Sequence, residues 1–249
     1  MVEALILRTW PVYEADQIVS FFTRDLGKLK GIAKSAAKSR RRFGGALEPM
    51  TYVLASYAEK PRQELVRLDA CEILASPLLN PVDYARAAAL AFMAEVLEET
   101  LQDRDPQDAV FRLALAVLEQ TRMGRIWLPV TYFSLWMVRL MGWMPELGRC
   151  TDCGRGLAGG AAYFESQRDG LVCTEHRHPA ARAISPESLT LAARIFREPI
   201  AALAGEEWPR NRAADLRRFA VQNLERHLEK RLRSAQVLRG MINVAGQGT

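Results

Sequence analysis

The sequence predicts a multidomain α+β protein in which a small N-terminal β-barrel is followed by an α-helical domain. Three observations support this fold class. Residues 1–75 contain short segments with the residue types of strands, whereas apolar residues recur with helical spacing from Asn80 onward. Between two helical stretches lies a glycine-rich segment with four potential metal ligands, which predicts an inserted hairpin.

Composition is typical of a soluble globular protein with one large or two ordinary domains. The chain has 249 residues, of which 49% are hydrophobic and 25% are charged. Glu3 interrupts the apolar start of the chain, and the longest uncharged stretch, 126–138, is too short to span a bilayer. We therefore expect a cytoplasmic protein without a membrane segment, in which only the tail after Arg239 is unstructured.

Five segments of the N-terminal region have the β-branched and aromatic residues of strands, at 4–8, 17–23, 29–34, 50–57 and 64–72. Turn residues separate them at Pro11, Gly27, the Gly44-Gly45 pair and Pro61. Five strands fit an OB-fold barrel, which binds nucleic acid across one face and its loops, and they fit an SH3-like barrel equally well. Cys71, in the last segment, is expected to be a buried free thiol.

A basic run enters the loop between the third and fourth predicted strands. Residues 27–47 contain no acidic residue and seven basic ones, namely Lys28, Lys30, Lys34, Lys38, Arg40, Arg41 and Arg42. Such a run creates a positive potential suited to a phosphate backbone, so these residues are the candidates for DNA binding. The alternative is a solvated loop without a ligand.

Aromatic residues of the same region are candidates for stacking on bases: Trp10, Tyr13, Phe21, Phe22, Phe43, Tyr52 and Tyr57. Most aromatic side chains in strands belong to the core, and the sequence alone assigns none of these to the nucleic acid.

Helix signals follow from residue 80. Asn80-Pro81 and Asp105-Pro106 each combine an N-cap with a proline at the first helical position. A third helix, about 128–141, is apolar on nearly all sides and is expected at the centre of a bundle. Its Arg139, with Arg122 and Arg125, is a candidate for binding an acidic peptide beside an apolar groove, or it extends along the surface to water.

The C-terminal part returns to helical patterns. Ser185-Pro186 caps one helix, and a last helix is predicted at about 212–239. Between Arg210 and Arg239 there are nine basic residues against three acidic ones, which favours a second phosphate-binding surface or an ordinary amphipathic helix. The expected organisation is a barrel at 1–79, a helical domain in two parts at 80–145 and 181–240, a hairpin at 146–180, and a flexible tail at 241–249.

The hairpin carries the pattern C-x2-C-x19-C-x2-H, formed by Cys150, Cys153, Cys173 and His176. Paired ligands at this spacing predict a tetrahedral zinc site, and four protein ligands leave no open position for water, so the zinc is expected to be structural. His178 is an alternative fourth ligand. The order of motifs differs from that of zinc deaminases, in which a ligand-x-Glu element precedes the C-x2-C pair.

Together, these features resemble the bacterial recombination mediator family RecO from residue 1 to about 240. The most specific parts are 26–34 (LGKLKGIAK), the basic cluster 39–43 followed by Gly45-Ala46-Leu47-Glu48-Pro49, and the hairpin at 150–176. The resemblance implies an N-terminal OB-fold, a helical domain and an inserted zinc hairpin. Family members commonly have four cysteines in that hairpin, whereas this chain has His176 at the last position, which is still compatible with zinc.

The resemblance also implies a function without catalysis and without a nucleotide cofactor. RecO-like proteins bind single- and double-stranded DNA, contact the acidic C-terminal tail of single-strand-binding protein, and associate with RecR. They anneal complementary strands and help load RecA, which implies a cytoplasmic, nucleoid-associated protein. From the residues alone, two other classes stay open: a zinc hydrolase or deaminase, and an OB-fold adaptor that binds RNA or protein in transcription or translation.

Overall fold

The computed structural model describes residues 1–59, 63–77 and 83–244. The chain divides into two compact units. One contains Met1–Gly124 together with the residues from Leu232 onward, and the other contains Arg125–Arg231. Among the described residues, none of the helices is long and apolar enough to cross a membrane.

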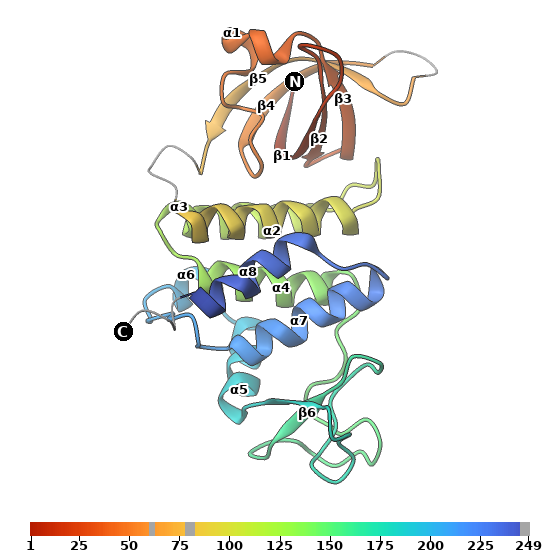
Figure 1. Cartoon of the computed structure of the whole chain (residues 1–249), viewed down its shortest axis with the longest axis vertical. Coiled ribbons are helices and arrows are strands. Elements are labelled where there is room, and N and C mark those ends of the chain that lie inside the picture. The colour runs from red at the N-terminus through yellow and green to blue at the C-terminus, as the bar shows by residue number, and fades with distance from the viewer. Residues whose placement is uncertain (60–62, 78–82, 245–249) are drawn as a thin grey trace. The chain divides into compact units, whose positions relative to one another are not determined.

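The first unit begins with a closed five-stranded barrel (Figure 1). Its strands are β1 (Val2–Pro11), β2 (Gln17–Thr23), β3 (Gly27–Ala33), β4 (Tyr52–Ala58) and β5 (Val66–Ala75). Their order around the barrel is β1-β2-β3-β5-β4, with β1 antiparallel to β4 and β3 parallel to β5. This order is that of an OB-fold and not of an SH3-like barrel, so the α+β fold class is confirmed.

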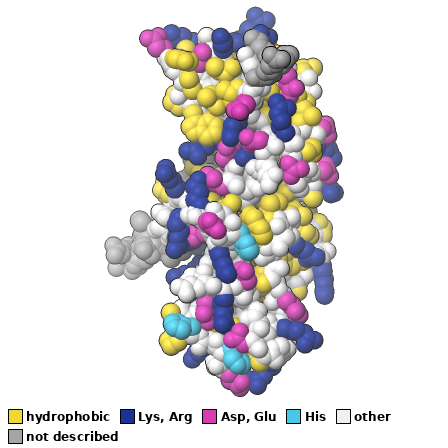
Figure 2. Space-filling model, turned by 90° about the vertical axis from the view of Figure 1, so that its right-hand side faces the viewer, with side chains coloured by type: hydrophobic (Ala, Val, Ile, Leu, Met, Phe, Trp, Pro, Cys, Tyr) yellow, Lys and Arg dark blue, Asp and Glu magenta, His cyan; other side chains and the backbone are white. Residues whose placement is uncertain are grey.

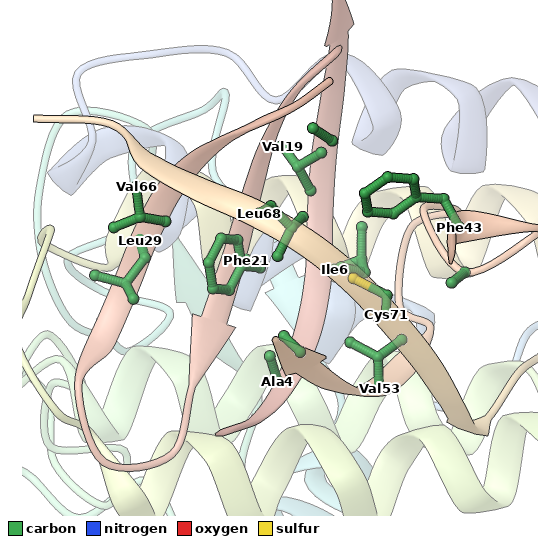
Figure 3. Packing of buried hydrophobic residues seen from close by; sticks show 13 residues of the cluster. Ala4, Ile6, Val19, Phe21, Leu29, Phe43, Val53, Val66, Leu68 and Cys71 are labelled. Atoms are coloured by element: carbon green, nitrogen blue, oxygen red, sulfur yellow. The ribbon is translucent and has the colours of Figure 1, made fainter. Parts of the chain in front are cut away.

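Alternating side chains fill the barrel (Figure 3). Ile6, Phe21 and Leu68 lie in the core and are at most 1% exposed, which buries apolar area from three strands at one place. Cys71 also lies in this cluster, and burial raises the pKa of its thiol to about 12. It is therefore the buried free thiol that the sequence predicts, and its raised pKa keeps it neutral.

The connection between β3 and β4 contains two short elements that the sequence did not indicate. A 3-10 turn at Ala36–Lys38 (η1) is followed by a one-turn helix, α1 (Arg40–Phe43). Phe43 is 3% exposed and belongs to the barrel core. An element of four residues is too short to show a helical period, and it is the burial of Phe43 that holds it against the barrel.

Three helices complete the first unit: α2 (Tyr84–Thr100), α3 (Asp108–Arg122) and α8 (Arg233–Val244). Figure 1 shows α2 and α3 lying across one end of the barrel, where Phe111 of α3 packs edge-on against Phe22, with the ring centroids 5.4 Å apart. Asp83 caps α2, whereas the predicted cap at Asn80-Pro81 lies outside the described residues. α3 begins later than predicted, because Asp105 accepts a hydrogen bond from the Gln107 side chain instead of capping the helix.

The second unit contains α4 (Trp127–Leu140), α5 (Pro186–Ile195), α6 (Ile200–Leu203) and α7 (Ala214–His227), with the hairpin strands β6 (Ala162–Phe164) and β7 (Arg182–Ile184). α4 is buried on most sides and packs against α7, as predicted for a central helix. Ser185 accepts a hydrogen bond from the backbone N–H of Ser188, 3.2 Å away, which confirms the predicted cap of α5.

The prediction of one C-terminal helix at 212–239 was wrong, because the chain breaks it into α7 and α8. Glu229 has a positive φ of 51°, which ends the helical path. The backbone N–H groups of Arg233 and Ser234 then donate to the carboxylate of Glu95 in α2, at 3.0 and 2.8 Å. A distant carboxylate thus supplies the N-terminal cap of α8.

Candidate metal centre and basic surface

Two tight turns build the hairpin that carries the candidate metal ligands. In the first, the N–H of Gly154 donates to the Cys150 carbonyl at 2.9 Å, and in the second, the N–H of His176 donates to the Cys173 carbonyl at 3.1 Å. Gly154 has a φ of 69°, a backbone conformation that a glycine adopts without steric cost. Each turn points the two side chains at its ends towards the same place.

The four predicted ligands converge. The thiol and imidazole donor atoms of Cys150, Cys153, Cys173 and His176 all lie within 4.8 Å of one another. Sγ of Cys153 and Sγ of Cys173 are 4.0 Å apart, and Sγ of Cys173 is 3.3 Å from Nδ1 of His176. Zn–S bonds of about 2.3 Å require S···S separations of roughly 3.8 Å in a tetrahedron. The donor set is therefore compact enough to hold a zinc ion.

The backbone around the hairpin favours thiolates at two of the cysteines. Burial raises the pKa of Cys150, but the backbone N–H groups of Cys153 and Cys173 outweigh it, and the net pKa lies below its ordinary value. Cys173 follows the same pattern, with N–H groups of His176 and Glu175 lowering its pKa against burial. Thiolate is the form of cysteine that ligates metal.

His178 is engaged elsewhere. Its Nδ1 accepts a hydrogen bond from the N–H of Ala180 at 3.1 Å, and its own N–H donates to Glu165 at 3.0 Å. Of the two histidines that the sequence offered, only His176 belongs to the converging set.

The hairpin is anchored on α7. Phe164 of β6 packs edge-on against Phe219, with ring centroids 5.5 Å apart. The His227 ring stacks on Trp143 at 5.0 Å and lies 3.5 Å from the Asp169 carboxylate. These contacts hold the metal-binding turns at a defined place within the second unit.

The basic run of the barrel divides into two groups. Lys28 is 6% exposed, and its ammonium group donates to the Glu98 carbonyl at 2.7 Å and lies 3.4 Å from Asp103. Lys30 also pairs with Asp103, at 3.5 Å. The structure thus turns the first two lysines of the run towards the helical part of the first unit, where they join it to the barrel.

The later residues of the run face solvent. Lys34, Lys38, Arg40 and Arg41 are exposed and form no ion pair within the described part of the chain. Arg42 differs from them, because it donates to the Lys34 carbonyl at 2.7 Å and lies over the Phe43 ring at 5.1 Å. Arg42 therefore shapes the segment that presents the other four cations.

An apolar groove of about 670 Å³ in the second unit contains one of the predicted peptide-binding arginines. Its walls include Met144, Leu157 and Leu189, and Arg139 lies 4.7 Å from the centroid of the Phe196 ring at its edge. Arg122 belongs to α3 in the first unit and pairs with Glu119 at 3.1 Å. Arg125 precedes α4 and does not line the groove. The apolar walls come from segments distant in sequence, so no local pattern indicated them.

The predicted basic face of the last helix is largely occupied. Arg217 is 8% exposed and donates to Thr131 at 2.8 Å and to the Arg212 carbonyl at 2.7 Å. Burial lowers its pKa to about 10. Arg226 pairs with Asp169 at 3.3 Å, and Arg231 pairs with Glu225 at 3.1 Å. Several cations of this segment therefore stabilise the fold.

The stretch 34–41, with its four exposed cations, is called the basic segment below. An OB-fold barrel with this exposed basic segment is joined here to a helical unit that carries a compact set of candidate metal ligands. This combination defines the class of OB-fold proteins with an embedded hairpin that could hold a metal ion. Figure 2 shows hydrophobic side chains of the barrel exposed beside lysines and arginines. Comparison with known proteins identifies the family. Residues 1–77 match the family model of the recombination protein O N-terminal domain, and residues 81–236 match that of its C-terminal domain.

Three relatives each cover between 76% and 95% of this chain. A DNA repair protein RecO from Koribacter versatilis is 54% identical over 236 residues, which are 95% of this chain and 96% of the relative. One from Anaeromyxobacter sp. (strain K) is 31% identical over 94% of this chain and 93% of the relative. Another, from Syntrophobacter fumaroxidans, is 33% identical over 76% of each. The chain belongs to the RecO family.

Proposed function

We propose that this protein is a DNA repair and recombination mediator that binds single- and double-stranded DNA and anneals complementary strands. The observation that carries the proposal is a group of four exposed cations between β3 and β4 of an OB-fold barrel: Lys34, Lys38, Arg40 and Arg41. Membership of a family whose relatives are named DNA repair proteins supports it.

The mechanism is electrostatic and geometric. Cations of the basic segment hold the phosphates of one strand and release its condensed counterions. A second strand is held on another basic surface. It then meets a first strand whose phosphate charge is partly neutralised, so the electrostatic repulsion that opposes pairing of the two strands falls. No covalent chemistry is required, so the protein acts without catalysis and without a nucleotide.

The metal in this proposal is zinc with a structural role. Three cysteines and a histidine are the ligands that zinc prefers, and with all four bound no position is left for a reacting water. When bound, zinc would tie the two turns of the hairpin to one another and contribute its binding free energy to folding.

The groove beside Arg139 is the proposed site for the acidic tail of single-strand-binding protein. A guanidinium at the edge of apolar walls suits a peptide that ends in a carboxylate and an apolar side chain. Capture of this tail would raise the local concentration of coated DNA near the barrel, so that strands coated by single-strand-binding protein also anneal. With RecR as a further partner, the protein helps load RecA in the nucleoid region of the cytoplasm.

The test is annealing of complementary DNA strands, bare and coated with single-strand-binding protein, without nucleotide. The variant Arg40→Ala/Arg41→Ala is expected to anneal more slowly and to bind DNA with a smaller salt slope, by about 0.7 for each lost phosphate contact to a single strand. A variant with the same net charge, Arg112→Ala/Arg197→Ala, removes two exposed arginines outside the barrel and should behave as the parent.

An unchanged salt slope in the Arg40→Ala/Arg41→Ala variant would move the DNA site away from this segment. Tighter binding of RNA than of DNA at matched salt would contradict the recombination role and favour an RNA-binding adaptor. Failure to anneal coated strands after Arg139→Ala, with bare strands unaffected, is the result expected for the acidic-tail site.

A further inference from the structure

Tyr13 has an exposed ring that packing does not explain. It lies in the turn between β1 and β2, and it is 85% exposed. Its φ is 56°, in the left-handed region that a bulky aromatic residue rarely adopts. Neither burial of the ring nor local backbone preference therefore accounts for a tyrosine at this position.

The turn that carries Tyr13 is attached to the basic segment. The N–H of Ala37 donates to the Ala15 carbonyl at 3.1 Å, and the N–H of Ser35 donates to the Asp16 carboxylate at 2.7 Å. These two hydrogen bonds join the β1–β2 turn to the residues between Lys34 and Lys38. The turn that carries the exposed ring is thus directly bonded to the segment that carries the exposed cations.

Trp10 provides a second aromatic face near this turn. Val19 points into the core, so its neighbours Ile18 and Ser20 point outward. The strand register pairs Ile18 with Trp10 and Ser20 with Arg8, so Trp10 and Arg8 also point outward. Trp10 is half-buried, and the Arg8 guanidinium lies 5.1 Å from its ring.

Elsewhere, helices cover the outside of these strands. Ser20 donates to Glu98 of α2 at 2.5 Å, and Phe22 packs on Phe111 of α3. At the turn end of the hairpin, Pro11 and Tyr13 are exposed and Trp10 is half-buried.

We propose that Trp10 and Tyr13 form a stacking platform for the bases of single-stranded DNA, beside the cations that bind its phosphates. The proposal rests on the DNA-binding function proposed above and assigns its single-strand specificity. Unpaired bases stack on exposed aromatic rings, whereas the bases of a duplex are already stacked on one another and are not accessible. The platform therefore favours single strands, while the lysines and arginines serve both forms of DNA.

Matched substitutions separate the ring from the fold. Tyr13→Asn removes the ring but tolerates the positive φ, and Tyr13→Phe keeps the ring. Trp10→Leu keeps apolar bulk without an aromatic face, and Trp10→Phe restores a smaller one. Affinities for an oligo(dT) and for a duplex of the same length are measured at several salt concentrations, and thermal melting confirms that each variant is folded.

Tyr13→Asn and Trp10→Leu are expected to bind oligo(dT) roughly 5- to 150-fold more weakly, the range for loss of one stacked base. Duplex affinity and the salt slope should stay as in the parent, because no phosphate contact is removed, and the phenylalanine variants should retain most of the affinity. When an oligonucleotide that contains 5-iodouracil is photo-crosslinked to the protein, it should become attached to the peptide that contains Trp10 and Tyr13.

Oligo(dT) affinities equal to that of the parent in both ring-removing variants would overturn the platform. Arg40→Ala/Arg41→Ala distinguishes this failure from failure of the proposed DNA site. If that variant binds DNA weakly while the ring variants do not, the basic segment binds DNA and the platform is wrong. If the ring variants alone are impaired, and only for single strands, the platform stands and the basic segment is not the phosphate site.

Discussion

At the residue scale, His176 and His178 are two positions apart but have different surroundings. His176 directs Nδ1 at the cysteine thiols, whereas His178 accepts a hydrogen bond from Ala180. His176→Ala should lose bound zinc and melt at a lower temperature, because a structural zinc contributes to folding. His178→Ala, the matched control, should keep its bound zinc and the melting temperature of the parent, as measured by metal analysis and thermal melting. Equal zinc content in the two variants would contradict the ligand assignment.

Glu206 should give the second unit an acid-sensitive contribution to stability. Hydrogen bonds from Arg194, at 2.7 Å, and from Arg212 lower its pKa from an ordinary 4.5 to about 2. Because the folded-state pKa lies below the unfolded one, this contribution is present above pH 4.5 and is lost as the pH falls towards 2. Glu206→Gln should therefore lower the melting temperature at pH 7 and have progressively less effect in acid.

The control for this measurement is Glu207→Gln, an adjacent carboxylate without an ion pair among the described residues. Its melting curve should follow that of the parent at each pH. A difference between Glu206→Gln and the parent that persists unchanged at pH 2 would refute the role of the ionised carboxylate.

At the element scale, α8 depends on a cap from another helix. Glu95 of α2 accepts hydrogen bonds from the N–H groups of Arg233 and Ser234, two donors that the helix itself cannot satisfy. Glu95→Ala should lower the free energy of unfolding by about 1 kcal/mol, the usual cost of losing a cap. Denaturant unfolding measures this value.

A comparison variant for the cap is Glu119→Ala, which removes an exposed carboxylate whose one ion pair within the described residues is with Arg122, at i,i+3. Exposed pairs of this kind contribute little, so its unfolding free energy should change by a few tenths of a kcal/mol. Equal losses in the two variants would mean that Glu95 acts as an ordinary surface charge.

At the scale of the whole molecule, the metal ligands and their supports belong to one unit. Cys150, Cys153, Cys173 and His176 lie within Arg125–Arg231, as do the contacts of the hairpin with α7. Removing the metal with a chelator should therefore increase hydrogen exchange mainly in residues 146–184 and in α7. The barrel strands should retain their protection, as measured by mass spectrometry. Equal loss of protection in β1–β5 would show that the metal stabilises the chain as a whole.

Much of the fold and of the candidate metal site follows from local patterns in the sequence. The five strands, the central helix α4 and the cap at Ser185 were predicted near their observed positions, because alternation, helical period and capping residues act over a few neighbours. The paired ligand spacing likewise predicted Cys150, Cys153, Cys173 and His176, since each turn brings its own two ligands together.

Contacts between distant segments decided the rest. Lys28 and Arg41 belong to one basic run, yet only the position of Glu98 and Asp103 shows that Lys28 is buried while Arg41 faces solvent. The sequence by itself determined the strands of the barrel, the central helix and the paired spacing of the metal ligands, because these signals are local. Only the tertiary structure decided which cations and which aromatic rings stay exposed, because burial depends on what packs against each side chain.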